Sequence, residues 1–162
     1  MIGAKQDWQY HGEVPVRGRK LVLLQQDEVV QALPLLYRLL PDLEIQNRKD
    51  WINEKLSLQQ LAQSRTRLID CLSILAKQRR SIEGLADALF NANIEINHYF
   101  SDHGWRMIRK ELSQIKKRRK KSHIEVSNDL VHRLKAFMSL KQLDSFDQAL
   151  DFLLSENEER NL

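Results

Sequence analysis

The chain has 162 residues and a single cysteine, Cys71. Its length allows one domain, or one domain with a small second module, and does not fit a multidomain enzyme. A single cysteine cannot form an intrachain disulfide, which favours a reducing compartment, so we expect a cytoplasmic protein. Residues 1–10 lack the apolar core of a signal peptide, and no apolar run approaches the ~20 residues that cross a membrane. We therefore expect neither secretion nor membrane insertion.

Charge is distributed unevenly along the sequence. The 26 Lys and Arg against 22 Asp and Glu give a net charge of only +4, yet residues 106–121 contain nine cations and one anion. Residues 142–162 reverse this, with six acids and one base. A dense basic segment beside neutral and acidic sequence is typical of a surface that binds a polyanion, most often nucleic acid. The alternative is a lysine-rich helix end that is merely solvated.

The spacing of apolar residues predicts a mostly helical protein. Residues 1–26 form a polar, irregular N-terminal arm, in which the apolar run 21–24 is too short to distinguish a strand from a helix. Helical spacing begins at Asp27, and Pro41 ends the first helix. A second helix includes residues 45–56.

Three longer helices follow, each beginning near a serine. Ser57 and Gln60 match a capping box, in which the two side chains satisfy backbone N–H groups at a helix start. Ser81 begins the next helix, and the third begins near Ser101 and loses its apolar face at Lys116. We expect residues 27–115 to form a helical bundle, followed by a basic connector at 116–121.

No group of residues predicts catalysis or a metal site. Cys71 lies among leucines without an activating base, which indicates a small core or boundary residue. His98 and His103 are five residues apart, on different faces of a helix, and with Asp102 they do not match a metal-ligand pattern. We expect a protein that is not an enzyme and that uses neither a cofactor nor a metal.

Residues 122–156 contain the most informative pattern. Ile124 and Val126 alternate with polar neighbours, as in a short β-strand. Such a strand needs a partner, and its own copy in a second chain would supply one. Ser127 then caps a helix, and Ser145 with Gln148 caps another. An acidic tail follows at 157–162.

The run from Lys120 to Leu130, followed by Arg133–Leu134 and by the segment 145–150, resembles the ribbon-helix-helix (MetJ/Arc) superfamily of DNA-binding proteins. The resemblance implies a dimer whose two strands form an antiparallel ribbon in the major groove. Outward side chains of the ribbon would read bases, and the start of the second helix would bind a phosphate. Two departures are the turn Leu143–Asp144, where many members have glycine, and Glu125, whose carboxylate repels phosphate.

These considerations assign three groups of residues. The base-reading residues are Lys121, His123 and Glu125. The phosphate-contacting residues are Lys116, Lys117, Arg118, Arg119, Lys120, Ser145 and Phe146, the first five from their charge and the last two from the resemblance. The ribbon and dimer core comprises Ile124, Val126, Leu130, Leu134, Phe137 and Leu150.

A ribbon-helix-helix module behind a helical domain also resembles the MatP family of chromosome organisers and the regulators of plasmid conjugation with the same domain order. The resulting fold is mostly α, an N-terminal helical bundle with a C-terminal dimeric ribbon-helix-helix module. The expected function is that of a bacterial, nucleoid- or plasmid-associated regulator that binds double-stranded DNA as a dimer, or a higher oligomer, and activates conjugation genes. Three alternatives stay open: a DNA-organising or partition protein, a helical adaptor whose N-terminal domain binds a protein, and a plain helical hairpin with residues 124 and 126 in a linker.

Overall fold

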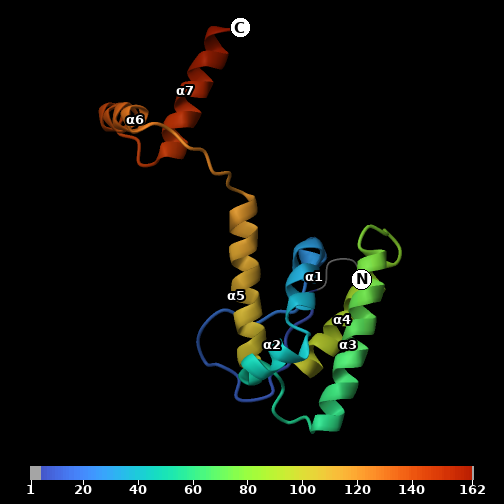
Figure 1. Cartoon of the computed structure of the whole chain (residues 1–162). Helices are drawn as coiled ribbons and strands as arrows, with labels where there is room; N and C mark the ends of the chain where they lie inside the picture. Colours follow the sequence, from blue (N-terminus) through green and yellow to red (C-terminus); the bar gives the residue numbers. More distant parts are fainter. Residues whose placement is uncertain (1–4, 162) are drawn as a thin grey trace. The chain divides into compact units, whose positions relative to one another are not determined.

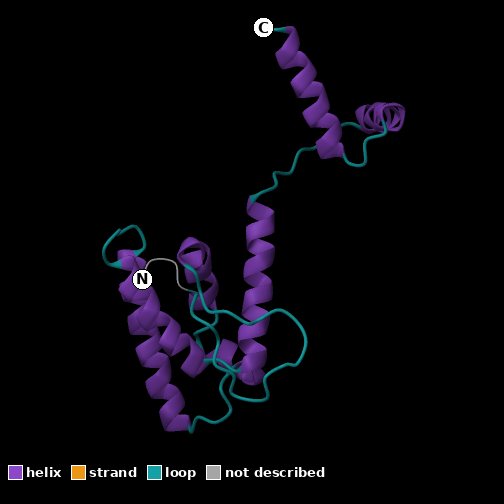
Figure 2. Ribbon diagram, turned by 180° about the vertical axis from the view of Figure 1, so that it is seen from behind, coloured by secondary structure: helices purple, strands orange, loops and turns teal. Residues whose placement is uncertain are grey.

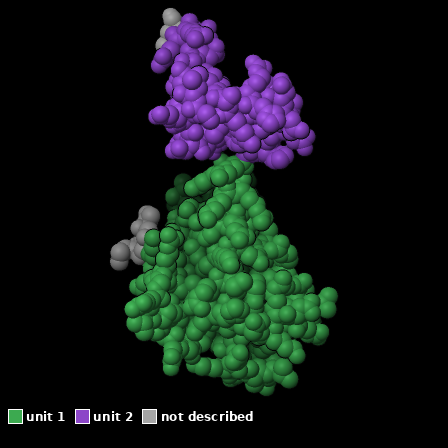
Figure 3. Space-filling model, turned by 90° about the vertical axis from the view of Figure 1, so that its left-hand side faces the viewer, with its two compact units in different colours: residues 1–121 green, residues 122–162 purple. Residues whose placement is uncertain are grey.

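The computed structural model describes residues 5–161 and divides the chain into two compact units, Met1–Lys121 and Ser122–Leu162 (Figure 3). Seven α-helices and two short 3-10 helices account for the regular structure of the described residues (Figure 2). The mostly helical fold predicted from the sequence is confirmed.

The first unit is built around long helices joined by short ones (Figure 1). Helix α3 packs on α4, and α1 packs on both α3 and α5. In chain order the elements of this unit are η1 (Gln26–Glu28), α1 (Val29–Arg38), α2 (Asp42–Asn47), η2 (Lys49–Trp51), α3 (Leu58–Gln78), α4 (Leu85–Tyr99) and α5 (Asp102–Arg119).

Local capping explains where the long helices begin. The predicted capping box is present: Ser57 Oγ accepts from the Gln60 amide at 3.2 Å, and Gln60 Oε1 accepts from the Ser57 amide at 2.9 Å. Ser101 caps α5 in the same way, through the Gly104 amide. The expected start at Ser81 is wrong by one turn, because the Ser81 hydroxyl caps a separate turn and α4 begins only at Leu85.

The N-terminal segment is irregular, as expected, but it belongs to the core. The Trp8 ring stacks on Trp105 with centroids 5.7 Å apart, and its Nε1 donates to Asp102 Oδ1 at 2.8 Å. Trp105 Nε1 donates to the Val22 carbonyl at 2.8 Å. The apolar run 21–24 forms neither a strand nor a helix, although Leu21, Leu23 and Leu24 are buried. These contacts attach the N-terminal segment to α5, which lies at the other end of the sequence of the first unit.

The second unit is a helical hairpin of α6 (Asn128–Lys141) and α7 (Phe146–Arg160). The predicted N-caps are present, with Ser127 Oγ 3.4 Å from the Leu130 amide and Ser145 Oγ 3.2 Å from the Gln148 amide. Gln142 ends α6 in the left-handed conformation, with φ 57°, so a residue with a side chain occupies the position where glycine is usual.

The predicted β-ribbon is wrong. Residues 122–126 form no strand, and nothing between residues 5 and 161 pairs with them; the two isolated β-bridges join Asp7 to Val22 and Ile52 to Phe100. A strand is stabilised by the backbone hydrogen bonds of a neighbour, which this segment lacks among the described residues. Ile124 is consequently 71% exposed and Val126 42% exposed. The expected ribbon-helix-helix fold is therefore corrected to a pair of capped helices preceded by a segment without regular structure.

Candidate nucleic-acid interface

Helix α5 has one buried face and one cationic face. Trp105, Ile108 and Leu112 are buried at spacings of three and four residues, so the positions between them turn outward. The outward stripe carries Arg106, Lys110 and Lys117, all exposed. These positions lie four and seven residues apart, which puts them on one side of a helix.

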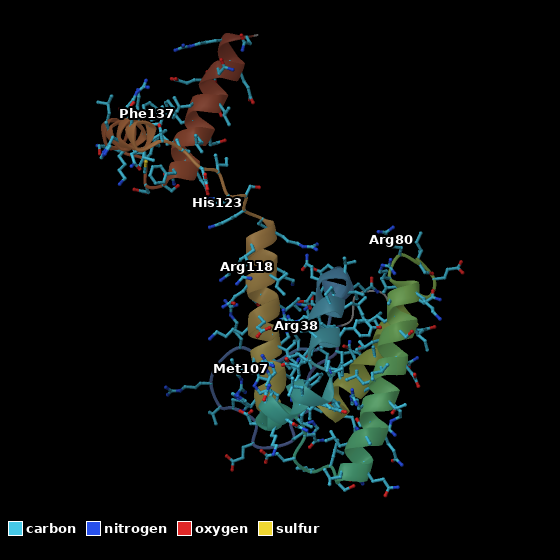
Figure 4. All side chains as sticks on the ribbon, viewed as in Figure 1. Arg38, Arg80, Met107, Arg118, His123 and Phe137 are labelled. Atoms are coloured by element: carbon cyan, nitrogen blue, oxygen red, sulfur yellow. The ribbon has the colours of Figure 1, made fainter. Side chains whose placement is uncertain are left out.

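Beyond Leu112 the burial of α5 falls away while its charge rises. Ile115 and Lys116 are half-buried, and residues 117–119, which complete the helix, are exposed. Cations in the last turn are also favoured by the helix dipole, whose negative end lies there. Arg118, labelled in Figure 4, belongs to this cationic end.

Two cations of the basic segment have a different partner. The Glu28 side chain is buried, with Oε1 2.7 Å from Arg109 Nη1 and Oε2 2.7 Å from Lys116 Nζ. Burial raises the pKa of Glu28, but the hydrogen bonds from Arg109 and Lys116 outweigh it, so the pKa lies below its usual value. Lys116, a predicted phosphate contact, is thus already compensated, and we leave it outside the interface.

The remaining cations of the segment form the surface that we call the α5 cationic surface. None of them lies within ion-pair distance of an acid among residues 5–161, and the one acid of the segment, Glu111, pairs with Arg38 at 3.3 Å. The α5 cationic surface consists of Arg106, Lys110, Lys117, Arg118, Arg119, Lys120 and Lys121.

The two units differ in charge. Residues 1–121 contain 22 Lys and Arg against 14 Asp and Glu, whereas residues 122–162 contain four against eight. The net positive charge that would favour a polyanion therefore lies in the first unit, whereas the hairpin, which contains the predicted phosphate contacts Ser145 and Phe146, carries a net negative charge.

Of the predicted base-reading residues, Lys121 belongs to the α5 cationic surface, and His123 and Glu125 lie in the segment before α6. The side chains of His123 and Glu125 are 87% and 93% exposed, with His123 Nε2 3.9 Å from Glu125 Oε1 (Figure 4). A nearby carboxylate offsets the charge of a protonated imidazole. Glu125 therefore opposes binding of an anion by this segment.

The predicted phosphate site at the start of α7 has an acidic setting. Ser145 Oγ accepts from the Gln148 amide, and Gln148 Oε1 accepts from the Asp144 amide at 2.8 Å, so both groups are engaged in capping. Asp144 and Asp147 flank Ser145 and Phe146, and both acids are exposed. Their negative charge disfavours a phosphate at this helix start.

The hairpin exposes most of its apolar side chains. Leu134 and Phe137 are half-buried, with the Phe137 ring 5.6 Å from that of Phe152, and Ala149 is the one buried apolar residue among positions 122–161. The large apolar side chains of this unit that are exposed are Ile124, Val126, Leu130, Leu140, Phe146, Leu150, Leu153 and Leu154.

The residues considered for metal binding or catalysis have separate partners. His98 Nδ1 lies 3.0 Å from Ser64 Oγ, and His103 pairs with Asp50 at 3.3 Å. Asp102 accepts hydrogen bonds from Trp8 and from two backbone amides, those of His11 and Gly12. Cys71 is half-buried, which fits the expected core or boundary residue, and burial raises the pKa of its thiol.

Sequence reasoning missed the cluster of Glu28, Arg109 and Lys116. Glu28 and Arg109 are 81 residues apart, and no local motif marks either residue as buried. The available signal is weak: Arg109 and Lys116 are seven residues apart and lie close to the apolar face of α5. A cation at such a position is a candidate ion-pair partner of a buried acid, but the spacing of residues does not identify the acid.

No helix within residues 5–161 combines the length and the apolar character needed to cross a membrane. Comparison of the chain with protein-family models, with curated proteins and with solved structures found no match.

Proposed function

We propose that the chain binds double-stranded DNA as a dimer and regulates transcription, with the α5 cationic surface as the contact to phosphates. The observation that carries the proposal is this surface, where seven exposed cations have no acidic partner among the described residues. A solvated helix end usually alternates both signs of charge, which pairs cations with acids. Here the only acid of the segment pairs with Arg38 instead.

The spacing of these cations suits an extended anion. Arg106 and Lys117 are eleven residues apart, which corresponds to about 16 Å along a helix. Duplex DNA carries about one charge per 1.7 Å of its axis, so a stripe of this length faces several phosphates at once. Cations on the last turn, such as Arg118 and Arg119, add contacts beyond the stripe.

The second unit supplies the dimer in this proposal. It has 41 residues, a size at which a single chain buries little core without a partner. Its exposed leucines indicate that a partner covers them, and the distribution of its charges indicates which partner. Helix α6 carries Arg133, Lys135 and Lys141, whereas the acids of the unit are concentrated on α7. A second copy of the hairpin therefore offers both apolar side chains and opposite charges.

Sequence preference is assigned to Lys121, the last residue of the α5 cationic surface, and to His123, an exposed side chain two residues farther along the chain. This assignment rests on the resemblance to ribbon-helix-helix proteins, and the ribbon itself forms no part of it. Side chains with donors recognise guanine or thymine acceptors in the grooves. A cytoplasmic, nucleoid- or plasmid-associated location in a bacterium belongs to the same proposal.

A matched pair of double variants tests the phosphate contact. Arg118→Ala with Arg119→Ala removes two charges from α5, and Arg79→Ala with Arg80→Ala removes two from the end of α3 (Figure 4). Fluorescence anisotropy with a random-sequence duplex should show weaker binding and a salt slope reduced by about 2 for the α5 variant only. Equal effects of the two variants, or wild-type binding that is independent of salt, would contradict the proposal.

Mapping of bound sites in the source cell separates the regulator from an organising or partition protein. A few sites at promoters support transcription regulation. Many sites spread over one region of a replicon would replace regulation by DNA organisation, and the absence of any enriched site would contradict sequence-specific binding.

A further inference from the structure

Glu28 connects the beginning of the first unit to the cationic end of α5. It ends η1, directly before α1, and its side chain is fully buried. Besides the two cations, the Gln25 amide donates to Glu28 Oε1 at 3.0 Å. Oε1 therefore accepts two hydrogen bonds, whereas Oε2 has only the ion pair with Lys116, and the side chain is held from its own element as well as from α5.

The two cations that reach Glu28 lie two turns apart on the same side of α5. Arg109 lies within the part of the helix that packs on the core, whereas Lys116 lies beyond Leu112, the last buried residue. From Ser113 onward, the contacts that hold α5 to the bundle are the half-buried Ile115 and the ion pair of Lys116 with Glu28. The Glu28 carboxylate thus contacts one cation in the packed part of α5 and one in the part beyond the last buried residue.

Such a contact fixes both the position and the rotation of a helix. A buried carboxylate is stable only while its cations remain in place, because an unpaired charge in the interior is costly. Rotation of α5 would withdraw Arg109 and Lys116 from Glu28. It would also move the stripe of Arg106, Lys110 and Lys117, since all five residues belong to one rigid helix.

We infer that Glu28 is a positioning residue for DNA recognition: it holds the distal part of α5 in one setting, so that the α5 cationic surface meets DNA in a fixed register. The inference rests on the proposed function and adds a residue that touches no DNA. It differs from a purely electrostatic role. An acid near a DNA-binding surface reduces affinity by its charge, and its removal would then strengthen binding to every sequence alike.

Glu111 provides the matched control, because it is also an acid adjacent to α5 cations and its loss changes the net charge equally. It pairs with Arg38 across 3.3 Å, and its side chain is 35% exposed, so no buried charge depends on it. Glu28→Gln and Glu111→Gln are compared in the full chain. The DNA probes are a duplex selected from a randomised pool by the wild-type protein and a random-sequence duplex.

Two readouts are measured for each variant. Glu28→Gln should raise the hydrogen-exchange rates of the amides of residues 113–119 about tenfold or more, while α3 and α4 remain protected. It should also reduce the ratio of selected to random affinity about tenfold, within the range that one lost base contact produces. Glu111→Gln should change neither the exchange rates nor the ratio. Equal behaviour of the two variants would overturn the inference.

A second pair of variants keeps the test decisive if Glu28→Gln does not fold. Lys116→Met leaves Glu28 paired with Arg109, and Lys117→Met is its exposed neighbour control. The inference requires faster exchange at residues 113–119 in Lys116→Met alone, and equal exchange in both overturns it. If the wild-type protein selects no site, sequence-specific binding fails, and the exchange data alone decide whether Glu28 holds α5.

Discussion

Lys116 and Lys117, adjacent residues of α5, should respond differently to the same substitution. Lys117 is exposed on the outward stripe, whereas Lys116 lies 2.7 Å from the buried carboxylate of Glu28. Lys116→Met and Lys117→Met each remove one positive charge and retain an apolar stem. A model based on charge density alone predicts the same loss of DNA affinity for both variants, whereas the structure predicts a difference in salt dependence and in stability.

The expected magnitudes follow from the role of each residue. A phosphate contact contributes about 0.9 to the slope of log affinity against log salt, which is roughly a 3.5-fold change between 50 and 200 mM. Lys117→Met should reduce the slope by this amount and leave the unfolding free energy within about 0.5 kcal/mol of wild type. Lys116→Met should leave the slope unchanged and reduce the unfolding free energy by about 1.5 to 3 kcal/mol, because the buried Glu28 Oε2 loses its only charged partner.

The assays are anisotropy titrations of a random-sequence duplex between 50 and 200 mM salt, and thermal unfolding without DNA. For the first unit, the loss at Lys116 corresponds to a decrease in Tm of roughly 5 to 12 °C. If Lys116→Met reduces the salt slope as much as Lys117→Met and both keep the wild-type Tm, Lys116 is an ordinary phosphate contact. The compensation by Glu28 would then be wrong.

Three further predictions concern the dimer, the response to pH and the packing of α5. Leu150→Glu on α7, where the side chain is 41% exposed, should give a monomer in sedimentation analysis, whereas the control Leu58→Glu, at an 88% exposed position of α3, should remain a dimer. Dimers of both variants would contradict a dimer interface formed by the hairpin helices. Burial raises the pKa of both Glu28 and Asp102, but hydrogen bonds lower both pKa values overall, so the stability these groups contribute is present above their unfolded-state pKa and is lost as pH falls through the folded-state values. Below pH ~4.5 the wild-type protein should therefore unfold more easily, and the stability of Glu28→Gln should depend less on pH; the same pH profile for both proteins would refute this. Gly104→Ala should destabilise the first unit by about 3 kcal/mol in denaturant titrations, because a Cβ at this position overlaps the Trp51 backbone. A variant with the wild-type unfolding midpoint would show that α5 does not approach η2 this closely.

Features that depend on neighbours in the sequence were predictable. The serines that begin α3, α5, α6 and α7 cap backbone amides three residues away, so the information for these helix starts is local. The loss of the apolar face of α5 near Lys116 and the cationic end that follows were visible from spacing and charge alone. Ser81 misled because a serine can also cap a single turn, and only the fold shows that the helix does not continue from it.

Features that depend on distant residues were decided by the tertiary structure. Period-two alternation at Ile124 and Val126 predicted a strand, but a strand requires backbone partners that alternation does not provide, and no residue from 5 to 161 pairs with this segment. The N-terminal segment enters the core through Trp8 and its contacts to α5, more than 90 residues away. Glu28 counts as one acid among 22 in the sequence, and only the fold makes it buried and joins it to Arg109 and Lys116. The positive charge of the basic segment was therefore predictable from the sequence. Which of its cations face solvent and which stabilise the bundle depends on burial, which is a property of the folded chain.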